Sequence, residues 1–121
     1  MGKISSKKAT VNYIEIEKKY PVTCKGLQDM FEEEYKLFLK KQYDYGTTNV
    51  TVGQDLSTPD GQRVAKSALI FRLNDKVQRL MNLVVKKGVT ESANEPIEDA
   101  FKDISLIAKI ALLVDRDQWG K

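Results

Sequence analysis

Residues 60–87, DGQRVAKSALIFRLNDKVQRLMNLVVKK, decide the fold class of this chain. Apolar residues recur in this stretch every three or four positions: Leu69, Leu73, Val77, Leu80 and Val84. This spacing places them along one side of an α-helix, as is typical of a helix that packs on a core. Pro59 fits the first turn of such a helix, preceded by Ser57 or Thr58 as a cap, and Gly88 fits its end. We therefore predict one long amphipathic helix over residues 60–87.

Two further segments carry helical patterns. From Thr23 to about Tyr43 the apolar residues again gather on one side, and Pro21 is expected to break the chain before them. A third helix is expected from Pro96, and residues 104–114 are apolar on almost every side. A helix of that kind normally lies at the centre of a domain or in a subunit interface.

The first residues are harder to assign. Residues 1–8 are basic and polar and are expected to form a flexible end. Residues 9–16 are rich in β-branched side chains, so they predict either a short strand or the start of a helix. The expected fold is all-α, a single domain over residues 1–121 with three main helices and an irregular or short-strand N-terminal segment. The small size favours a homo-oligomer, a dimer or a tetramer.

Composition excludes several classes of site. The 121 residues include no histidine, which removes imidazole catalysis and almost every zinc site. The single cysteine, Cys24, excludes an internal disulfide. No long uncharged apolar run is present, so no membrane span is expected. The net charge is only +3, so a DNA-binding protein is not expected, although an anionic ligand is possible.

The end of the helix predicted from Thr23 to about Tyr43, together with the segment that follows it, has the residue types of a phosphate or base contact. The candidates are Lys41, Tyr45, Gly46, Thr47, Thr48 and Asn49. Lysine attracts phosphate, tyrosine can stack on a base, and glycine lets the backbone approach a ligand closely. The alternative is a helix C-terminal turn with a packed tyrosine.

A second set of candidates lies along the long helix. Arg72, Asp75, Lys76, Arg79 and Asn82 share a stripe beside the apolar seam. They form either a solvated face, with Asp75 paired to Arg72 or Arg79, or a phosphate clamp in which Asp75 orients Arg79.

Two carboxylates start the third helix. Asp99 and Asp103 are four residues apart, so they share one face and could hold Mg²⁺ if the protein is an enzyme. Asp103 also precedes the most apolar stretch and needs a partner, for which an arginine of the second helix is expected.

Three motifs in order produce a family resemblance. They are Lys41-Gln-Tyr-Asp44-Tyr45-Gly46, then Arg72-Leu-Asn-Asp75-Lys76-Val-Gln-Arg79-Leu-Met-Asn82-Leu, then Glu98-Asp99-Ala-Phe-Lys-Asp103. Together they resemble the nucleotide-modification-associated helical domain found in many bacteriophages. The resemblance implies nucleotide handling, in the cytoplasm of an infected bacterial host.

Three functions remain open at this point. The first is a non-catalytic phage protein, similar to anti-CBASS and anti-Thoeris sponges, that sequesters a cyclic or otherwise signalling nucleotide and needs no cofactor. The second is a Mg²⁺-dependent pyrophosphatase similar to the MazG-like all-α enzymes, with Glu32, Glu33 and Glu34 completing the metal site. The third is a structural helical module. We expect the first, with a cyclic dinucleotide or a related signal as the ligand.

Overall fold

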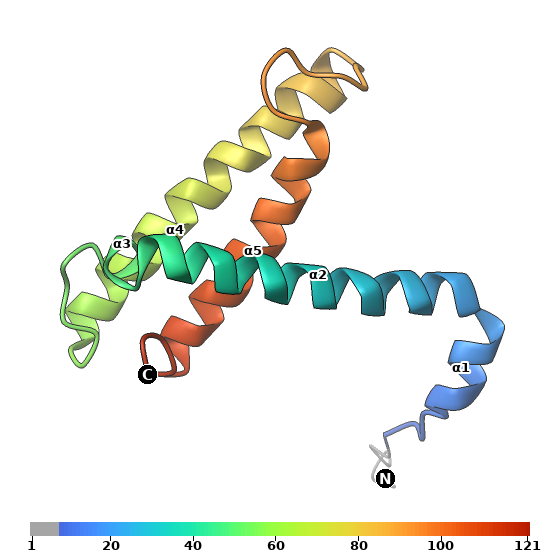
Figure 1. The fold of residues 1–121 in the computed structure, drawn as a ribbon, viewed down its shortest axis with the longest axis horizontal. Helices are drawn as coiled ribbons and strands as arrows, with labels where there is room; N and C mark the ends of the chain where they lie inside the picture. Colours follow the sequence, from blue (N-terminus) through green and yellow to red (C-terminus); the bar gives the residue numbers. More distant parts are fainter. Residues whose placement is uncertain (1–7) are drawn as a thin grey trace, which may run out of the picture. The chain divides into compact units, whose positions relative to one another are not determined.

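The computed structural model describes residues 8–121, and every regular element in that range is helical (Figure 1). The elements are α1 (Tyr13–Lys19), α2 (Pro21–Tyr45), α3 (Thr48–Thr51), α4 (Pro59–Leu80), a π-helical segment (Met81–Lys86) and α5 (Ile97–Asp115). The all-α prediction is therefore confirmed. The chain divides into two compact units, residues 1–33 and 34–121.

Of the two structures predicted for residues 9–16, a short strand or the start of a helix, the helix is the one that forms. Residues 13–19 form α1, because Asn12 caps this helix and accepts a hydrogen bond from the Glu15 amide at 3.2 Å. The next helix also starts earlier than expected, at Pro21, where proline is tolerated because first-turn amides need no helical partner. The predicted flexible end at residues 1–8 lies outside the described residues except for Lys8.

Within residues 8–33 no residue is buried. Several large apolar side chains are instead exposed there, including Tyr13, Ile14, Val22 and Leu27. This unit therefore has no core of its own among its described residues.

The second unit is built on two antiparallel helices, α4 and α5, which lie side by side (Figure 1). Side chains of α2 from Glu34 onward reach α5, where Glu34 contacts Lys109 and Lys41 contacts Asp103. A buried cluster joins these elements to α3 and the C-terminal turn: Val50, Ala65, Leu69, Val114 and Trp119. The apolar third helix is thus central to this unit, as its composition predicts.

Residues 55–61 fix the start of α4. Thr58 is the N-cap, and its hydroxyl accepts a hydrogen bond from the Gly61 amide at 3.0 Å. The Asp55 carboxylate accepts hydrogen bonds from the hydroxyl and the amide of Ser57, and these bonds lower its pKa. The cap and Pro59 were both predicted from the sequence.

The long helix is not α-helical to its end. It changes to π-helical geometry over Met81–Lys86, which corrects the prediction of one α-helix over residues 60–87. A π-turn contains more residues than an α-turn, so Val84 leaves the predicted apolar seam and is 43% exposed. Gly88 then takes a positive φ of 62° and ends the helix, in agreement with its predicted role.

Candidate functional site

A pocket of about 630 Å³ lies in the second unit, lined by α2, α3, α4, α5 and the C-terminal turn. Its volume is within the range of small-molecule sites. Its apolar lining consists of Phe38, Val50, Leu106, Ile107, Ile110 and Trp119. Its polar lining consists of Lys41, Gln42, Tyr45, Asn49, Arg72, Asp75, Lys76, Arg79 and Asp103.

Trp119 forms part of the apolar wall. It is only 7% exposed, and its ring meets Phe38 edge to face with centroids 6.2 Å apart. The indole Nε1 donates a hydrogen bond to the Thr47 carbonyl at 3.2 Å. These two contacts hold the ring in one orientation.

Asp103 joins two lysines in the pocket. Its carboxylate is 3.0 Å from the Lys76 Nζ and 3.6 Å from the Lys41 Nζ. The hydrogen bond from Lys76 to Asp103 raises the pKa of Lys76; partial burial and the Arg79 charge oppose this, whereas the charges of Asp103 and Glu95 add to it. Lys76 therefore stays protonated.

The two arginines of α4 are held by backbone carbonyls. Arg72 donates to the Asn49 carbonyl at 2.9 Å. Arg79 donates to the Pro96 carbonyl at 3.3 Å and also to that of Glu95. Within the described residues neither guanidinium is in an ion pair, so each is oriented by a neutral partner without losing its net charge.

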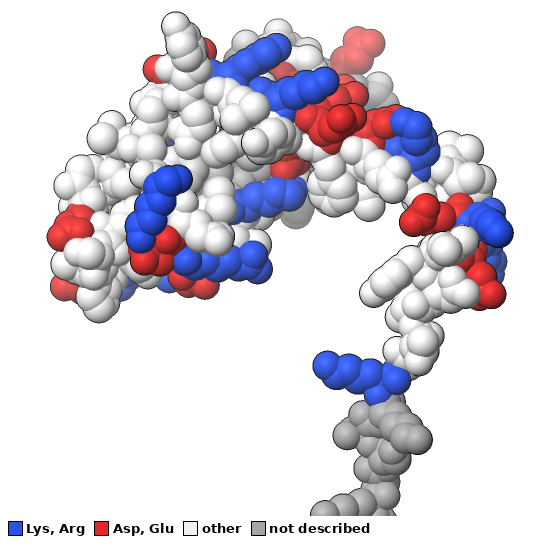
Figure 2. All heavy atoms as spheres, turned by 60° about the horizontal axis from the view of Figure 1, so that its bottom comes forward, with Lys and Arg blue, Asp and Glu red and all other residues white. Residues whose placement is uncertain are grey.

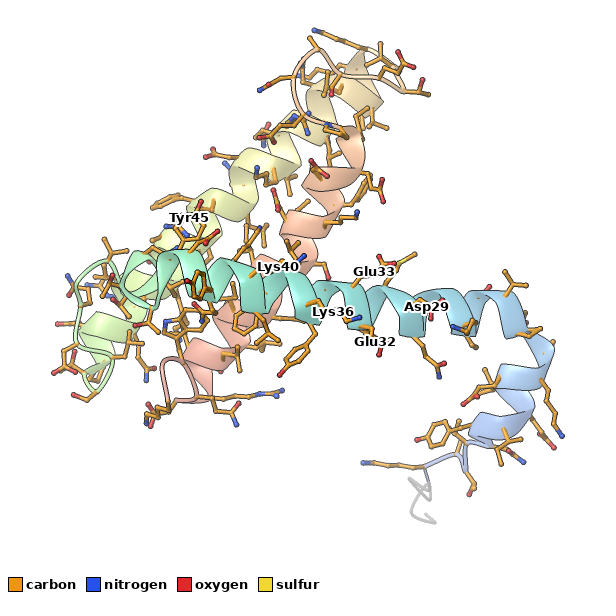
Figure 3. The ribbon with its side chains drawn as sticks, in the orientation of Figure 1. Asp29, Glu32, Glu33, Lys36, Lys40 and Tyr45 are labelled. Atoms are coloured by element: carbon orange, nitrogen blue, oxygen red, sulfur yellow. The ribbon has the colours of Figure 1, made fainter. Side chains whose placement is uncertain are left out.

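Most of the residues predicted for a ligand site lie around this one pocket. Lys41, Tyr45, Asn49, Arg72, Asp75, Lys76, Arg79 and Asp103 all line it, although they come from four different helices. Figure 3 labels Tyr45, the last residue of α2. The sequence motifs thus converge in space.

The other predicted residues have local roles and do not line the pocket. Gly46 ends α2 with a φ of 66°, and its amide donates to the Gln42 carbonyl. Thr47 and Thr48 start α3, and Asn82 lies in the π-helical segment. Their predicted ligand contacts have no support in the geometry.

Two predicted pairings are wrong. Asp103 pairs with lysines, and no arginine of α4 contacts it, because both arginines reach carbonyl groups instead. Asp75 makes no hydrogen bond or ion pair with Arg72 or Arg79 among the residues that the structure describes, so it does not orient Arg79.

The predicted acidic residues do not converge. Asp99 lies in the first turn of α5 outside the pocket lining. Glu32 and Glu33 are exposed on α2, where Figure 3 labels them. Glu34 instead lies against α5, with its Oε1 2.6 Å from the Lys109 Nζ and its Oε2 accepting a hydrogen bond from the Ser105 hydroxyl at 2.6 Å. Over residues 8–121 no three acidic or cysteine side chains are placed to hold a metal ion.

Sequence reasoning missed the apolar wall of the pocket and the Glu34 network. The apolar run of α5 supplied Leu106, Ile107 and Ile110, but its composition alone did not indicate which sides face a pocket. No local signal in the sequence identifies the wall, because it depends on the contact between Trp119 and Phe38, which are far apart in the chain.

Comparison with known proteins adds no relative. No protein-family model, curated protein or solved structure matches this chain. The resemblance to the phage domain therefore rests on the three quoted motifs. Among the described residues, no helix has the length and apolar character needed to cross a membrane.

Proposed function

We propose that this pocket binds a phosphate-bearing nucleotide and holds it without chemical change. The observation that carries the proposal is the convergence of four cationic side chains on one pocket with an apolar wall: Lys41, Arg72, Lys76 and Arg79. Phosphate needs charged hydrogen-bond donors, and a base needs a flat apolar surface. The pocket offers both.

The charge distribution favours a pocket ligand over an extended polyanion. The pocket holds four cations and two carboxylates, an excess of two positive charges. On the face drawn in Figure 2, by contrast, basic and acidic side chains are intermixed. A DNA-binding surface would need a continuous basic stripe. A small anion in the pocket explains the arrangement better.

In this proposal the biological role follows the phage resemblance. The protein would act in the cytoplasm of an infected bacterium and sequester a cyclic or otherwise signalling nucleotide of host defence. Sequestration requires tight binding and no acid or base, which agrees with a chain that has no histidine.

The pyrophosphatase alternative has less support. Its central ligand, Asp103, is within 3.0 Å of one ammonium group and 3.6 Å of another. A divalent cation at this carboxylate would be repelled by both lysines. Asp99 is not beside it in the pocket.

We also propose that copies of the chain associate through residues 13–30. Isolated helices of fewer than about 12 to 15 residues are marginal in water, and α1 is much shorter. No described residue before Glu34 is buried, so the apolar side chains of this unit need a partner to cover them. A second copy supplies the same apolar side chains.

The following experiment tests the binding proposal against its alternatives. The protein is incubated with a panel of cyclic dinucleotides, ADP-ribose derivatives and nucleoside triphosphates, with and without Mg²⁺, then separated from free ligand and denatured by heat. Recovery of intact nucleotide is the expected result. A monophosphate product that appears only with Mg²⁺ would instead support the pyrophosphatase, and no retention would leave a structural module.

A further inference from the structure

The positive charge of the pocket is concentrated at two separate places. Arg72 and Arg79 are seven residues apart on α4, two turns or about 10 Å along the helix axis. Their anchors keep them apart, since Arg72 reaches back to Asn49 in α3 and Arg79 reaches forward to Pro96. The two guanidinium groups are therefore directed toward opposite ends of the pocket.

The middle of the pocket is close to neutral. Lys76 lies between the two arginines in the sequence, and both it and Lys41 share the Asp103 carboxylate. Lys76 is also 3.9 Å from the Glu95 carboxylate. The side chain of Asp75 adds a further negative charge on the same stretch of the pocket lining. A phosphate placed in the middle meets carboxylates, whereas among the described residues neither Arg72 nor Arg79 is in an ion pair.

Each arginine also has donors left for a ligand. A guanidinium carries five N–H groups in a planar fork. The hydrogen bonds to the carbonyls of Asn49, Pro96 and Glu95 use one N–H of Arg72 and two of Arg79. The carbonyl partners hold each fork in place, which lowers the conformational entropy lost on binding.

From this geometry we infer, resting on the proposed function, that the ligand carries two anionic groups on separate parts of its body, one for Arg72 and one for Arg79. Cyclic dinucleotides and nucleoside bisphosphates share this chemistry. The adjacent phosphates of a nucleoside diphosphate reach only one arginine. The apolar wall that includes Trp119 then lies against the part of the ligand between its two anionic groups.

Calorimetric titration with four adenine ligands tests the inference: cyclic di-AMP, adenosine 3′,5′-bisphosphate, ADP and AMP. At least one of the first two is expected to bind about tenfold or more tightly than ADP, since it engages two charged hydrogen-bonding sites. ADP carries more negative charge than cyclic di-AMP, so nonspecific electrostatic attraction alone would favour ADP. Tighter binding of cyclic di-AMP would therefore not be explained by net charge. Which of the first two binds more tightly distinguishes a cyclic dinucleotide from a bisphosphate.

Substitutions identify the two contacts. Arg72→Ala and Arg79→Ala should each lower the affinity for the two-anion ligand about tenfold or more. The affinity for AMP should fall in only one of the two variants. Arg72→Lys and Arg79→Lys keep the charge without the fork and provide variants with less risk to folding. Arg63→Ala, on the same helix but outside the pocket lining, is the control and should change nothing.

The two proposals fail in different ways. Equal or tighter binding of ADP, or equal loss of AMP binding in both arginine variants, overturns the two-anion inference and leaves nucleotide binding in place. If none of the four ligands binds and the nucleotide panel is also not retained, the proposed function itself is overturned.

Discussion

The Glu34 carboxylate connects α2 to α5 at the point where the second unit begins. This carboxylate contacts both Lys109 and Ser105. The Lys109 Nζ also donates a hydrogen bond to the Ser105 hydroxyl at 2.8 Å, so each of the three side chains contacts the other two. Partial burial alone would raise the pKa of Glu34, but the hydrogen bonds from Lys109 and Ser105 and the Lys109 charge together lower it.

Glu34→Gln should therefore destabilise the fold in a pH-dependent way. Because the folded-state pKa lies below the ordinary value of 4.5, the carboxylate stabilises the fold above that pH and loses this effect as pH falls through the folded pKa. Urea unfolding near neutral pH should show a loss of about 1.5 kcal/mol, and the difference from wild type should shrink below pH 4.5. Glu33→Gln, at an exposed neighbour, is the control. A loss that is constant across this range would contradict the assignment.

Arg79→Ala should weaken nucleotide binding by about 1.5–3 kcal/mol, because it removes charged hydrogen bonds to phosphate. The same substitution also removes the contacts with the carbonyls of Glu95 and Pro96, so the melting temperature of each variant is measured beside its affinity. Arg63→Ala controls for the loss of one positive charge from α4. Unchanged affinity in Arg79→Ala would remove this residue from the site.

At the scale of elements, two glycines in helices differ in the space around them. A Cβ at Gly61 would collide with the Asp55 carbonyl, which the loop before α4 holds in place. A Cβ at Gly26, in α2, would have no atom of another part of the chain within 4 Å. The first glycine allows a close approach of backbone, and the second only lowers helix propensity.

Alanine should consequently have opposite effects at these positions. Gly61→Ala is expected to destabilise the protein by about 1–3 kcal/mol through overpacking against backbone. Gly26→Ala is expected to stabilise α2 by about 0.5–1 kcal/mol. Circular dichroism during thermal unfolding measures both changes. Stabilisation by both substitutions would show that the close contact at Gly61 is not maintained.

Sequence patterns predicted the three main helices because each has local signals: Thr58 and Pro59 start α4, and Gly88 ends its π-helical extension. They left α1 undecided between a strand and the start of a helix, since its β-branched residues fit both and only the cap formed by Asn12 favours the helix. Nor did they predict the π-helical turn, because an apolar period of 3.6 residues assumes regular α-geometry throughout.

At the scale of the whole molecule, the sequence predicted which residues line the pocket better than it predicted which of them pair with one another. The motifs around Lys41 and Arg72 both contribute to the pocket, since short spacings fix which residues share a helix face. The partners of Asp103, Arg72 and Arg79 depend on which helices meet, and that is set by tertiary packing. The apolar wall needs Trp119 to lie beside Phe38, a contact between distant segments that no local pattern encodes.

Self-association through residues 13–30 predicts a mass above that of one chain. Light scattering at micromolar concentration should give a multiple of 13.7 kDa. Leu27→Glu, which charges a side chain that is 52% exposed in this unit, should lower the mass. The same change at Val85, 66% exposed in the other unit, should not. A wild-type mass near 13.7 kDa would contradict the assembly.

The central claim is that the pocket around Arg72 and Arg79 binds a nucleotide, and the single indole of the chain gives it a direct test. In a proton–nitrogen NMR spectrum Trp119 contributes the one tryptophan indole signal, from a ring in the pocket wall. Titration with cyclic di-AMP, ADP and AMP in turn should shift this signal and the amides of residues 41–49 and 72–79 for at least one ligand, while the amides of α1 stay in place. Shifts confined to residues outside the pocket would contradict the claim, as would no shifts with any of the three together with no retention of the nucleotide panel.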